Sequence, residues 1–122
     1  MMMQRTLIEL EQFEEGRLLS QPEKVLERLN QSLCRRQGAT TRFATAACAI
    51  FDAADLTIQV SGAGHPAPLL VSKRGTSRKL PVHGPLLGIF ENEIYEKTTI
   101  QLQHGDRVVF YSDGLEQATD AV

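Results

Sequence analysis

The feature that most constrains the fold is a single change of hydrophobic period at Gly38. Before Gly38, apolar residues recur every three or four positions, as on one face of an amphipathic helix. After it, short apolar or alternating runs are separated by Gly, Pro and Asp, as in strands joined by turns. Helices followed by a run of antiparallel strands predict an α+β fold.

Two helices are predicted before Gly38. An apolar stripe and a glycine stop mark the first: Met3, Leu7, Leu10 and Gly16. The second begins with a capping box formed by Ser20 and Glu23, and Pro22 lies in its first turn, where a missing N–H costs little. Leu26 lies beside the apolar face of this helix, which is formed by Val25, Leu29 and Leu33.

Strands are predicted over 43–51, 56–61, 67–72, 78–80, 94–102 and 107–112, with turns at 52–55 and 104–106. The first and last strands have no polar face, which is typical of strands buried on both sides. In the strand over 94–102, Ile100 and Leu102 are expected to point into the core. The segment 81–88 is rich in proline and glycine and is therefore predicted to be a loop.

The composition narrows the class of function. The chain has 122 residues, 42% apolar and 23% charged, which is typical of one globular domain or slightly less. A net charge of −2 does not provide the basic surface of a nucleic-acid binder. No apolar run approaches the ~18 residues of a membrane span, and early glutamates argue against a secretory leader. Cys34 and Cys48 form no Cys-x-x-Cys motif, so we expect packed thiols in a reduced, cytoplasmic chain.

Asp113 is the strongest candidate for chemistry. A carboxylate at the end of an apolar strand, followed by Gly114, is well placed to bind a hard metal ion. A strand-ending Asp-Gly turn is the common structural alternative. Because Mg²⁺ and Mn²⁺ prefer about six oxygen ligands, one aspartate cannot form a site alone.

The segment 62–66 reads Gly-Ala-Gly-His-Pro and could place His65 over a site, since glycine lets another backbone approach closely. A hairpin turn with a surface histidine explains the same pattern. Thr45, in the middle of a predicted strand, could reach a site or be an ordinary strand threonine. His65, His83 and His104 fall in separate loops without the spacing of a zinc site.

Four motifs stand in a specific order after Gly38: Phe43-Ala-Thr45, Ala63-Gly-His-Pro-Ala-Pro-Leu-Leu70, Gly84-Pro-Leu-Leu-Gly-Ile89 and Leu102-Gln-His-Gly-Asp-Arg-Val-Val-Phe-Tyr-Ser-Asp-Gly-Leu115. They follow a helix with the pattern Pro-x-x-x-Leu-x-x-Leu-Asn. Together they resemble the bacterial PPM-type metal-dependent protein serine/threonine phosphatases. The branch is that typified by sporulation stage II protein E (SpoIIE) and by stress-response phosphatases, and the resemblance covers nearly the whole chain.

This resemblance implies a four-layer α-β-β-α sandwich with a two-metal centre of Mn²⁺ or Mg²⁺ at one end. It also implies that Asp113 is a metal ligand and that four residues lie near the site: Thr45, Gly64, His65 and Gly114. In such a centre the two ions activate a water molecule, which attacks phosphorus in line without a covalent enzyme intermediate.

The chain departs from the family pattern in its metal ligands. It contains neither the early Gly-Gly-Asp motif nor the late Asp-Asp pair that complete the family's centre, and Leu86 stands where many relatives have proline. We therefore expect residues 1–122 to be a partial phosphatase domain with negligible activity alone. Whether it is an excised fragment, the product of a truncated gene or part of a longer protein stays open.

The function expected of the parent domain is metal-dependent hydrolysis of phosphoserine or phosphothreonine on a regulatory protein. The resemblance implies an anti-sigma-factor antagonist (an anti-anti-sigma protein) as substrate, and an upstream sensor or receiver domain is common in the family. The alternative is a catalytically inactive, phosphatase-like module that binds a partner protein. Uncovered apolar strands further predict self-association, whereas neither nucleic acid nor a membrane is an expected partner.

Overall fold

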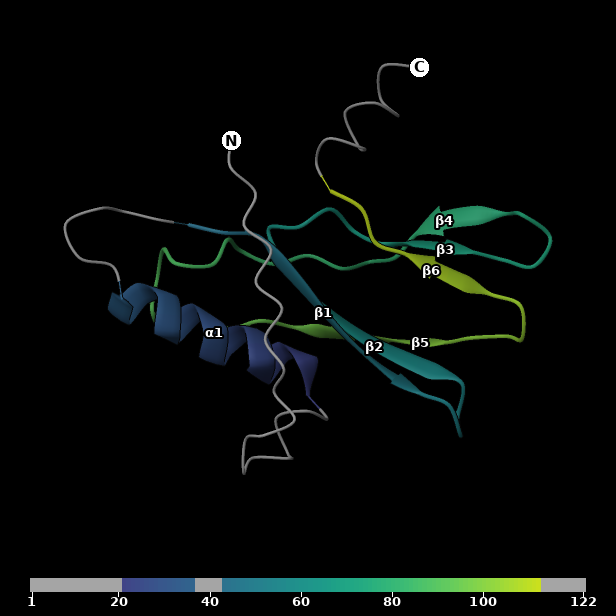
Figure 1. Cartoon of the computed structure of the whole chain (residues 1–122), viewed down its shortest axis with the longest axis horizontal. Coiled ribbons are helices and arrows are strands. Elements are labelled where there is room, and N and C mark those ends of the chain that lie inside the picture. The colour runs from purple at the N-terminus through teal and green to yellow at the C-terminus, as the bar shows by residue number, and fades with distance from the viewer. Residues whose placement is uncertain (1–20, 37–42, 113–122) are drawn as a thin grey trace, which may run out of the picture.

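The computed structural model describes residues 21–36 and 43–112, which form one helix and six strands (Figure 1). The elements are α1 (Pro22–Arg36), β1 (Ala46–Asp52), β2 (Thr57–Ala63), β3 (Leu69–Val71), β4 (Ser77–Lys79), β5 (Lys97–Gln101) and β6 (Arg107–Val109). The predicted α+β class is confirmed. The first predicted helix and the capping residue Ser20 lie outside the described residues.

The strands form two three-stranded antiparallel sheets, with the orders β1-β2-β5 and β4-β3-β6. One apolar cluster is shared by the two sheets and the loop between β4 and β5: Ile58, Val60, Leu70, Leu80, Val82, Ile100 and Leu102. Ile100 and Leu102 are each 8% exposed, which confirms that both point inward. The sheets therefore stack face to face, as the strand alternation requires for burial.

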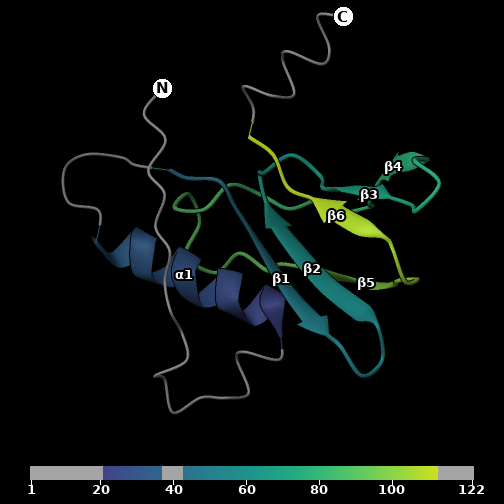
Figure 2. The ribbon, with the colours of Figure 1, turned by 45° about the vertical axis from the view of Figure 1, so that its right-hand side comes forward.

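The helix α1 packs against the other face of the first sheet (Figure 2). Its buried residues recur every four positions: Pro22, Leu26 and Asn30. Leu26 was predicted beside the apolar face but lies at its centre, in a cluster with Ala63, Leu87 and Tyr95. The described residues thus form helix, sheet and sheet, three successive layers of an α-β-β-α sandwich. Among them, no helix has the length and apolar character needed to cross a membrane.

The prediction that the strands over 43–51 and 107–112 are buried on both sides is wrong for the described part of the chain. Phe51 is 55% exposed and Phe110 is 42% exposed. Both strands are sheet edges, β1 in one sheet and β6 in the other. An apolar run shows that neither face of the strand carries polar residues. It does not show whether the strand lies at the edge of its sheet, where it has no neighbouring strand on one side and its side chains are more exposed.

Segment 80–84 closes the side of the sandwich formed by β4 and β5. Leu80 and Val82 are 1% and 4% exposed and belong to the core between the sheets. Thr98 Oγ1 in β5 donates a hydrogen bond of 2.8 Å to the carbonyl oxygen of Pro81. The loop predicted from its prolines and glycines is therefore confirmed, but it is part of the core rather than a surface connection.

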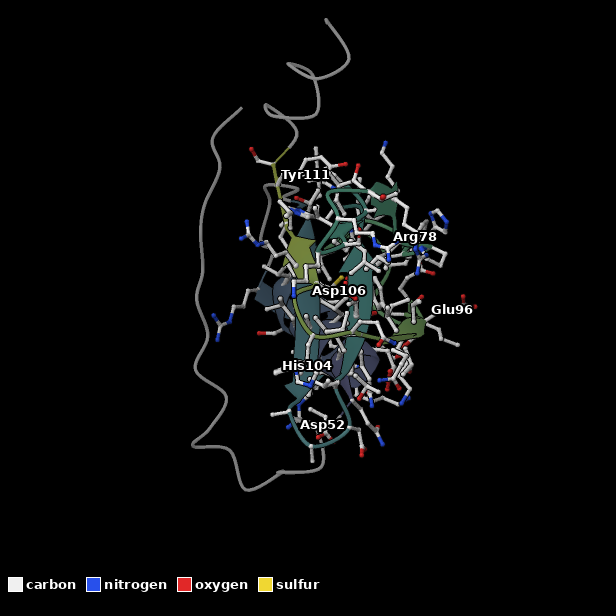
Figure 3. All side chains as sticks on the ribbon, turned by 90° about the vertical axis from the view of Figure 1, so that its right-hand side faces the viewer. Asp52, Arg78, Glu96, His104, Asp106 and Tyr111 are labelled. Atoms are coloured by element: carbon white, nitrogen blue, oxygen red, sulfur yellow. The ribbon has the colours of Figure 1, made fainter. Side chains whose placement is uncertain are left out.

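The turns predicted at 52–55 and 104–106 are confirmed, and both lie at the end of the molecule that faces the viewer in Figure 3. In the first, the Asp52 carboxylate accepts hydrogen bonds from two backbone N–H groups of the turn. In the second, the Asp106 carboxylate accepts one from the backbone N–H of Gln103. Aspartate side chains thereby satisfy backbone donors that have no partner in the sheets.

Candidate functional site

The segment 62–66 crosses from one sheet to the other, because β2 belongs to the first sheet and β3 to the second. This excludes the hairpin turn that the sequence allowed. Gly64 has a φ of 62°, a left-handed conformation that glycine adopts without a steric penalty. A Cβ at this position would lie 2.5 Å from Cδ2 of Leu86. Both the backbone conformation and the packing therefore favour glycine here.

Replacing Gly64 with alanine is expected to lower the free energy of unfolding by about 2–3 kcal/mol, because left-handed strain adds to displacement of Leu86. Gly75 is the matched control. It also has a positive φ, of 91°, but a Cβ there would meet nothing within 4 Å. Gly75→Ala should therefore lose only about 1 kcal/mol. Urea unfolding followed by circular dichroism measures both, and equal losses would show that Leu86 does not constrain the crossover.

Thr45 and His65 meet at this crossover. Oγ1 of Thr45 lies 3.3 Å from Nδ1 of His65. The sequence predicted Thr45 in the middle of a strand, but Thr45 directly precedes β1. Ala46 forms an isolated β-bridge with Gly64, which aligns the two segments. The structure thus brings together three residues that the family resemblance placed near a site.

A third segment reaches this end of the sandwich through Gly84 and Leu87. The carbonyl of Gly84 accepts a hydrogen bond of 2.8 Å from the N–H of Gly64. Ala44 and Leu87 exchange two backbone hydrogen bonds, of 3.1 and 3.0 Å. A Cβ on Gly84 would lie 1.8 Å from the carbonyl oxygen of Gly62, so only glycine fits against β2. Backbone contacts therefore hold the three segments in place.

The predicted metal ligand Asp113 and its neighbour Gly114 lie outside the described residues. The strand that precedes them, β6, pairs antiparallel with β3, with Val109 opposite Leu69. This register carries the described residues after Val109 back along the segment that joins His65 to β3, and the ribbon follows this course (Figures 1 and 2). The end of the described chain therefore approaches the crossover.

Metal ligands are not gathered among residues 21–36 and 43–112, where no group of three or more His, Cys, Asp or Glu side chains could hold an ion. Cys34 and Cys48 are both free and half-buried. Burial, and then the negative charge of Glu23, raises the pKa of the Cys48 thiol to about 11. The thiol is therefore protonated and weakly nucleophilic at neutral pH, in agreement with the prediction of packed thiols.

Asn30 has a role that the sequence pattern did not reveal. Its side chain is fully buried, with Oδ1 accepting a hydrogen bond of 2.7 Å from the N–H of Gly88. Its Nδ2 donates a hydrogen bond of 2.7 Å to the carbonyl of Phe90. The sequence feature that could have indicated this role is a polar residue four positions after Leu26, which places Asn30 on the same face of the helix as Leu26. Because buried polar groups are paired, such a residue predicts a specific partner.

Two further contacts hold the same loop. Glu27 Oε2 in α1 accepts a hydrogen bond of 3.2 Å from the N–H of Tyr95. The Tyr95 hydroxyl donates one of 3.2 Å to the carbonyl of Leu86. Burial, and then the negative charge of Glu93, raises the pKa of Tyr95 to about 12, so the hydroxyl keeps its proton for this bond. The loop that shapes the crossover is thus anchored to α1.

Comparison with known proteins agrees with the motif order. The sequence model of the family described as Stage II sporulation protein E (SpoIIE) matches residues 1–122. Phosphoserine phosphatase RsbP of Bacillus subtilis is 28% identical over 101 residues, which cover 80% of this chain and 25% of RsbP. Protein IcfG of Synechocystis sp. is 22% identical over 89 residues, which cover 73% of this chain and 14% of IcfG. The chain thus spans a quarter or less of these relatives, and no solved structure gives a significant match.

Proposed function

Because the chain belongs to the stage II sporulation protein E family, we propose that it forms part of a phosphatase domain in bacterial signalling. The proposed reaction is metal-dependent hydrolysis of phosphoserine or phosphothreonine on a regulatory protein. The observation that carries the proposal is the family match over residues 1–122, and RsbP, a relative named as a phosphoserine phosphatase, supports it. The meeting of Thr45, Gly64 and His65 at one end of the sandwich adds structural support.

The described residues hold no group of three or more side chains that could bind a metal ion. The metal centre is therefore proposed from the family resemblance. From this chain we assign Asp113 as a ligand of Mn²⁺ or Mg²⁺, with Gly114 beside it. Both ions prefer oxygen ligands, and a single aspartate leaves most coordination positions to other groups. When bound, a two-metal centre polarises phosphoryl oxygens and activates water.

Thr45 and His65 are assigned to the border of the phosphoryl site rather than to the metal. The 3.3 Å contact between the Thr45 hydroxyl and Nδ1 of His65 orients the imidazole ring. At Gly64 and Gly84 the backbone packs closely against neighbouring segments, because a side chain at either position would clash with Leu86 or with the backbone of Gly62. These residues shape the site and position a substrate, and none of them is assigned a proton transfer.

The proposed substrate is a phosphorylated anti-sigma-factor antagonist, and the proposed source of control is a sensor or receiver domain of a longer protein. Both come from the family resemblance, with the similarity to RsbP as support. The proposed location is the cytoplasm, which agrees with the free thiols of Cys34 and Cys48.

A phosphatase assay tests this proposal. Residues 1–122 alone are expected to give no turnover of p-nitrophenyl phosphate in millimolar Mn²⁺, because Asp113 is the one ligand that we assign to the chain. The longest protein that the gene encodes is expected to dephosphorylate a phosphoserine protein, to lose activity on chelation with EDTA and to recover it with Mn²⁺.

Two outcomes would contradict these expectations. If the longer protein binds the phosphoprotein without metal-dependent turnover, the inactive binding module is the correct reading. If residues 1–122 give turnover that disappears in Asp113→Asn, the chain holds a complete centre and the ligand count is wrong.

A further inference from the structure

The loop between Gly88 and Lys97 presents the two most exposed large apolar side chains in the described part of the chain. Ile94 is 75% exposed and Phe90 is 68% exposed. The N–H of Glu93 donates a hydrogen bond of 3.3 Å to the carbonyl of Phe90, so a backbone turn separates the two residues within one loop. Exposed apolar side chains on one loop are candidates for an interaction site.

Three contacts join this loop to α1. Asn30 donates to the carbonyl of Phe90, and Glu27 accepts from the N–H of Tyr95. Arg35 Nε lies 2.8 Å from Glu91 Oε1, which joins the loop to the last turn of α1. A binding surface that is fixed before the partner arrives loses less conformational entropy on association. These contacts hold the backbone on both sides of Ile94, at Phe90 and Tyr95, against α1.

A hollow of about 320 Å³ lies beside Ile94, lined by His83, Gly84, Pro85, Ile94 and Glu96. Pro85 and Ile94 make part of its wall apolar, and Glu96 adds a carboxylate. Glu96 is exposed and projects from the side of the molecule (Figure 3). The hollow can thus receive an apolar side chain next to a negative charge.

The ionisable side chains of segment 90–96 are acidic apart from the buried Tyr95. They are Glu91, Glu93 and Glu96. Glu91 is paired with Arg35, whereas the negative charge of Glu93 reaches Tyr95 strongly enough to contribute to its raised pKa. Lys97, which follows this segment, is exposed and basic, and His83 lines the hollow, so the carboxylates of segment 90–96 set the charge of the loop itself. Carboxylates repel the phosphates of nucleic acids and of anionic lipids. The chemistry of the loop therefore favours a protein with positive charge.

We propose that Phe90, Glu93, Ile94 and Glu96, here called the acidic loop patch, dock a protein segment that presents one apolar side chain between lysine or arginine residues. The apolar side chain enters the hollow beside Ile94, and the basic residues face Glu93 and Glu96. Such an arrangement has an apolar centre with a charged rim, as protein interfaces commonly do. The proposal does not depend on catalytic activity at the crossover.

A peptide-display selection on the whole chain tests the proposal. A random peptide library is panned against immobilised residues 1–122, and the enriched peptides are synthesised with a fluorophore for polarisation measurements. The enriched peptides are expected to carry an apolar residue flanked by Lys or Arg. Phe90→Ser and Ile94→Ser are expected to weaken their binding at least tenfold, because each removes apolar contact at the centre of the patch.

Phe51→Ser is the matched control, since Phe51 is also a largely exposed phenylalanine but lies on β1. It should leave the affinity unchanged. Glu93→Gln and Glu96→Gln should lower the affinity severalfold and reduce its dependence on salt. If a serine variant fails to fold by circular dichroism, these two glutamine variants carry the test.

Several results would overturn the proposal. Enrichment of acidic or purely apolar peptides would assign the patch a different chemistry. Binding that is unchanged in the Phe90 and Ile94 variants would place the docking surface elsewhere. An absence of enriched peptides would remove the docking role. Self-association of the chain that Ile94→Ser abolishes would make a second copy the occupant instead.

Discussion

Replacing Asn30 with leucine is expected to lower the free energy of unfolding by about 3 kcal/mol, although a buried polar group is exchanged for an apolar one. Leucine fills the space but leaves the N–H of Gly88 and the carbonyl of Phe90 without the partner that Asn30 supplies. Removing the partner of a buried backbone group costs roughly 1–3 kcal/mol, and the bond to Gly88 is buried whereas the bond to Phe90 is partly buried. Urea unfolding of both proteins, followed by circular dichroism, measures the loss.

Two further substitutions separate the causes. Asn30→Asp keeps an acceptor for the N–H of Gly88 but removes the donor to the carbonyl of Phe90, so it should also lower the free energy of unfolding. This loss of stability should become smaller at low pH, because a protonated carboxyl group is neutral and can donate a hydrogen bond. Gln31→Ala changes the next residue of α1 and should cost less than about 1 kcal/mol. A stability of Asn30→Leu equal to that of the native chain would mean that α1 does not anchor the loop.

Replacing Asp113 with asparagine in the longest protein that the gene encodes is expected to lower kcat/KM for a phosphoprotein by on the order of 10³-fold. Asparagine has nearly the same shape as aspartate but lacks the negative charge that a divalent cation requires. The loss should be accompanied by weaker Mn²⁺ binding in calorimetry, and excess Mn²⁺ should restore activity only in part. Thermal unfolding should change little, because asparagine also suits an Asp-Gly turn.

Asp106→Asn is the matched control for this substitution. Asp106 ends a turn, and its carboxylate accepts a hydrogen bond from the N–H of Gln103. It directly precedes β6, whereas Asp113 follows β6 along the sequence. Its replacement should leave both Mn²⁺ binding and turnover unchanged. Unchanged activity and metal binding in Asp113→Asn would instead reduce Asp113 to a residue that only shapes a turn.

The sequence by itself determined the elements whose signals are local. The period change at Gly38 predicted the α+β class, and alternation placed Ile100 and Leu102 in the core, as the structure confirms. Aspartate and glycine predicted the turns at 52–55 and 104–106. The order of motifs was sufficient to identify the family. These signals are readable because backbone geometry and the pattern of burial act over a few neighbouring residues.

Only the tertiary structure decided which distant residues meet. The sequence allowed either a hairpin turn or part of a site at segment 62–66. The structure shows that this segment crosses between the two sheets and that His65 contacts Thr45. It also showed that Phe51 and Phe110 are exposed, although their strands read as buried. It gave Asn30 partners that follow it by 58 and 60 positions along the chain. Such facts depend on how sheets stack and which strand is an edge, and no local period of residues encodes either.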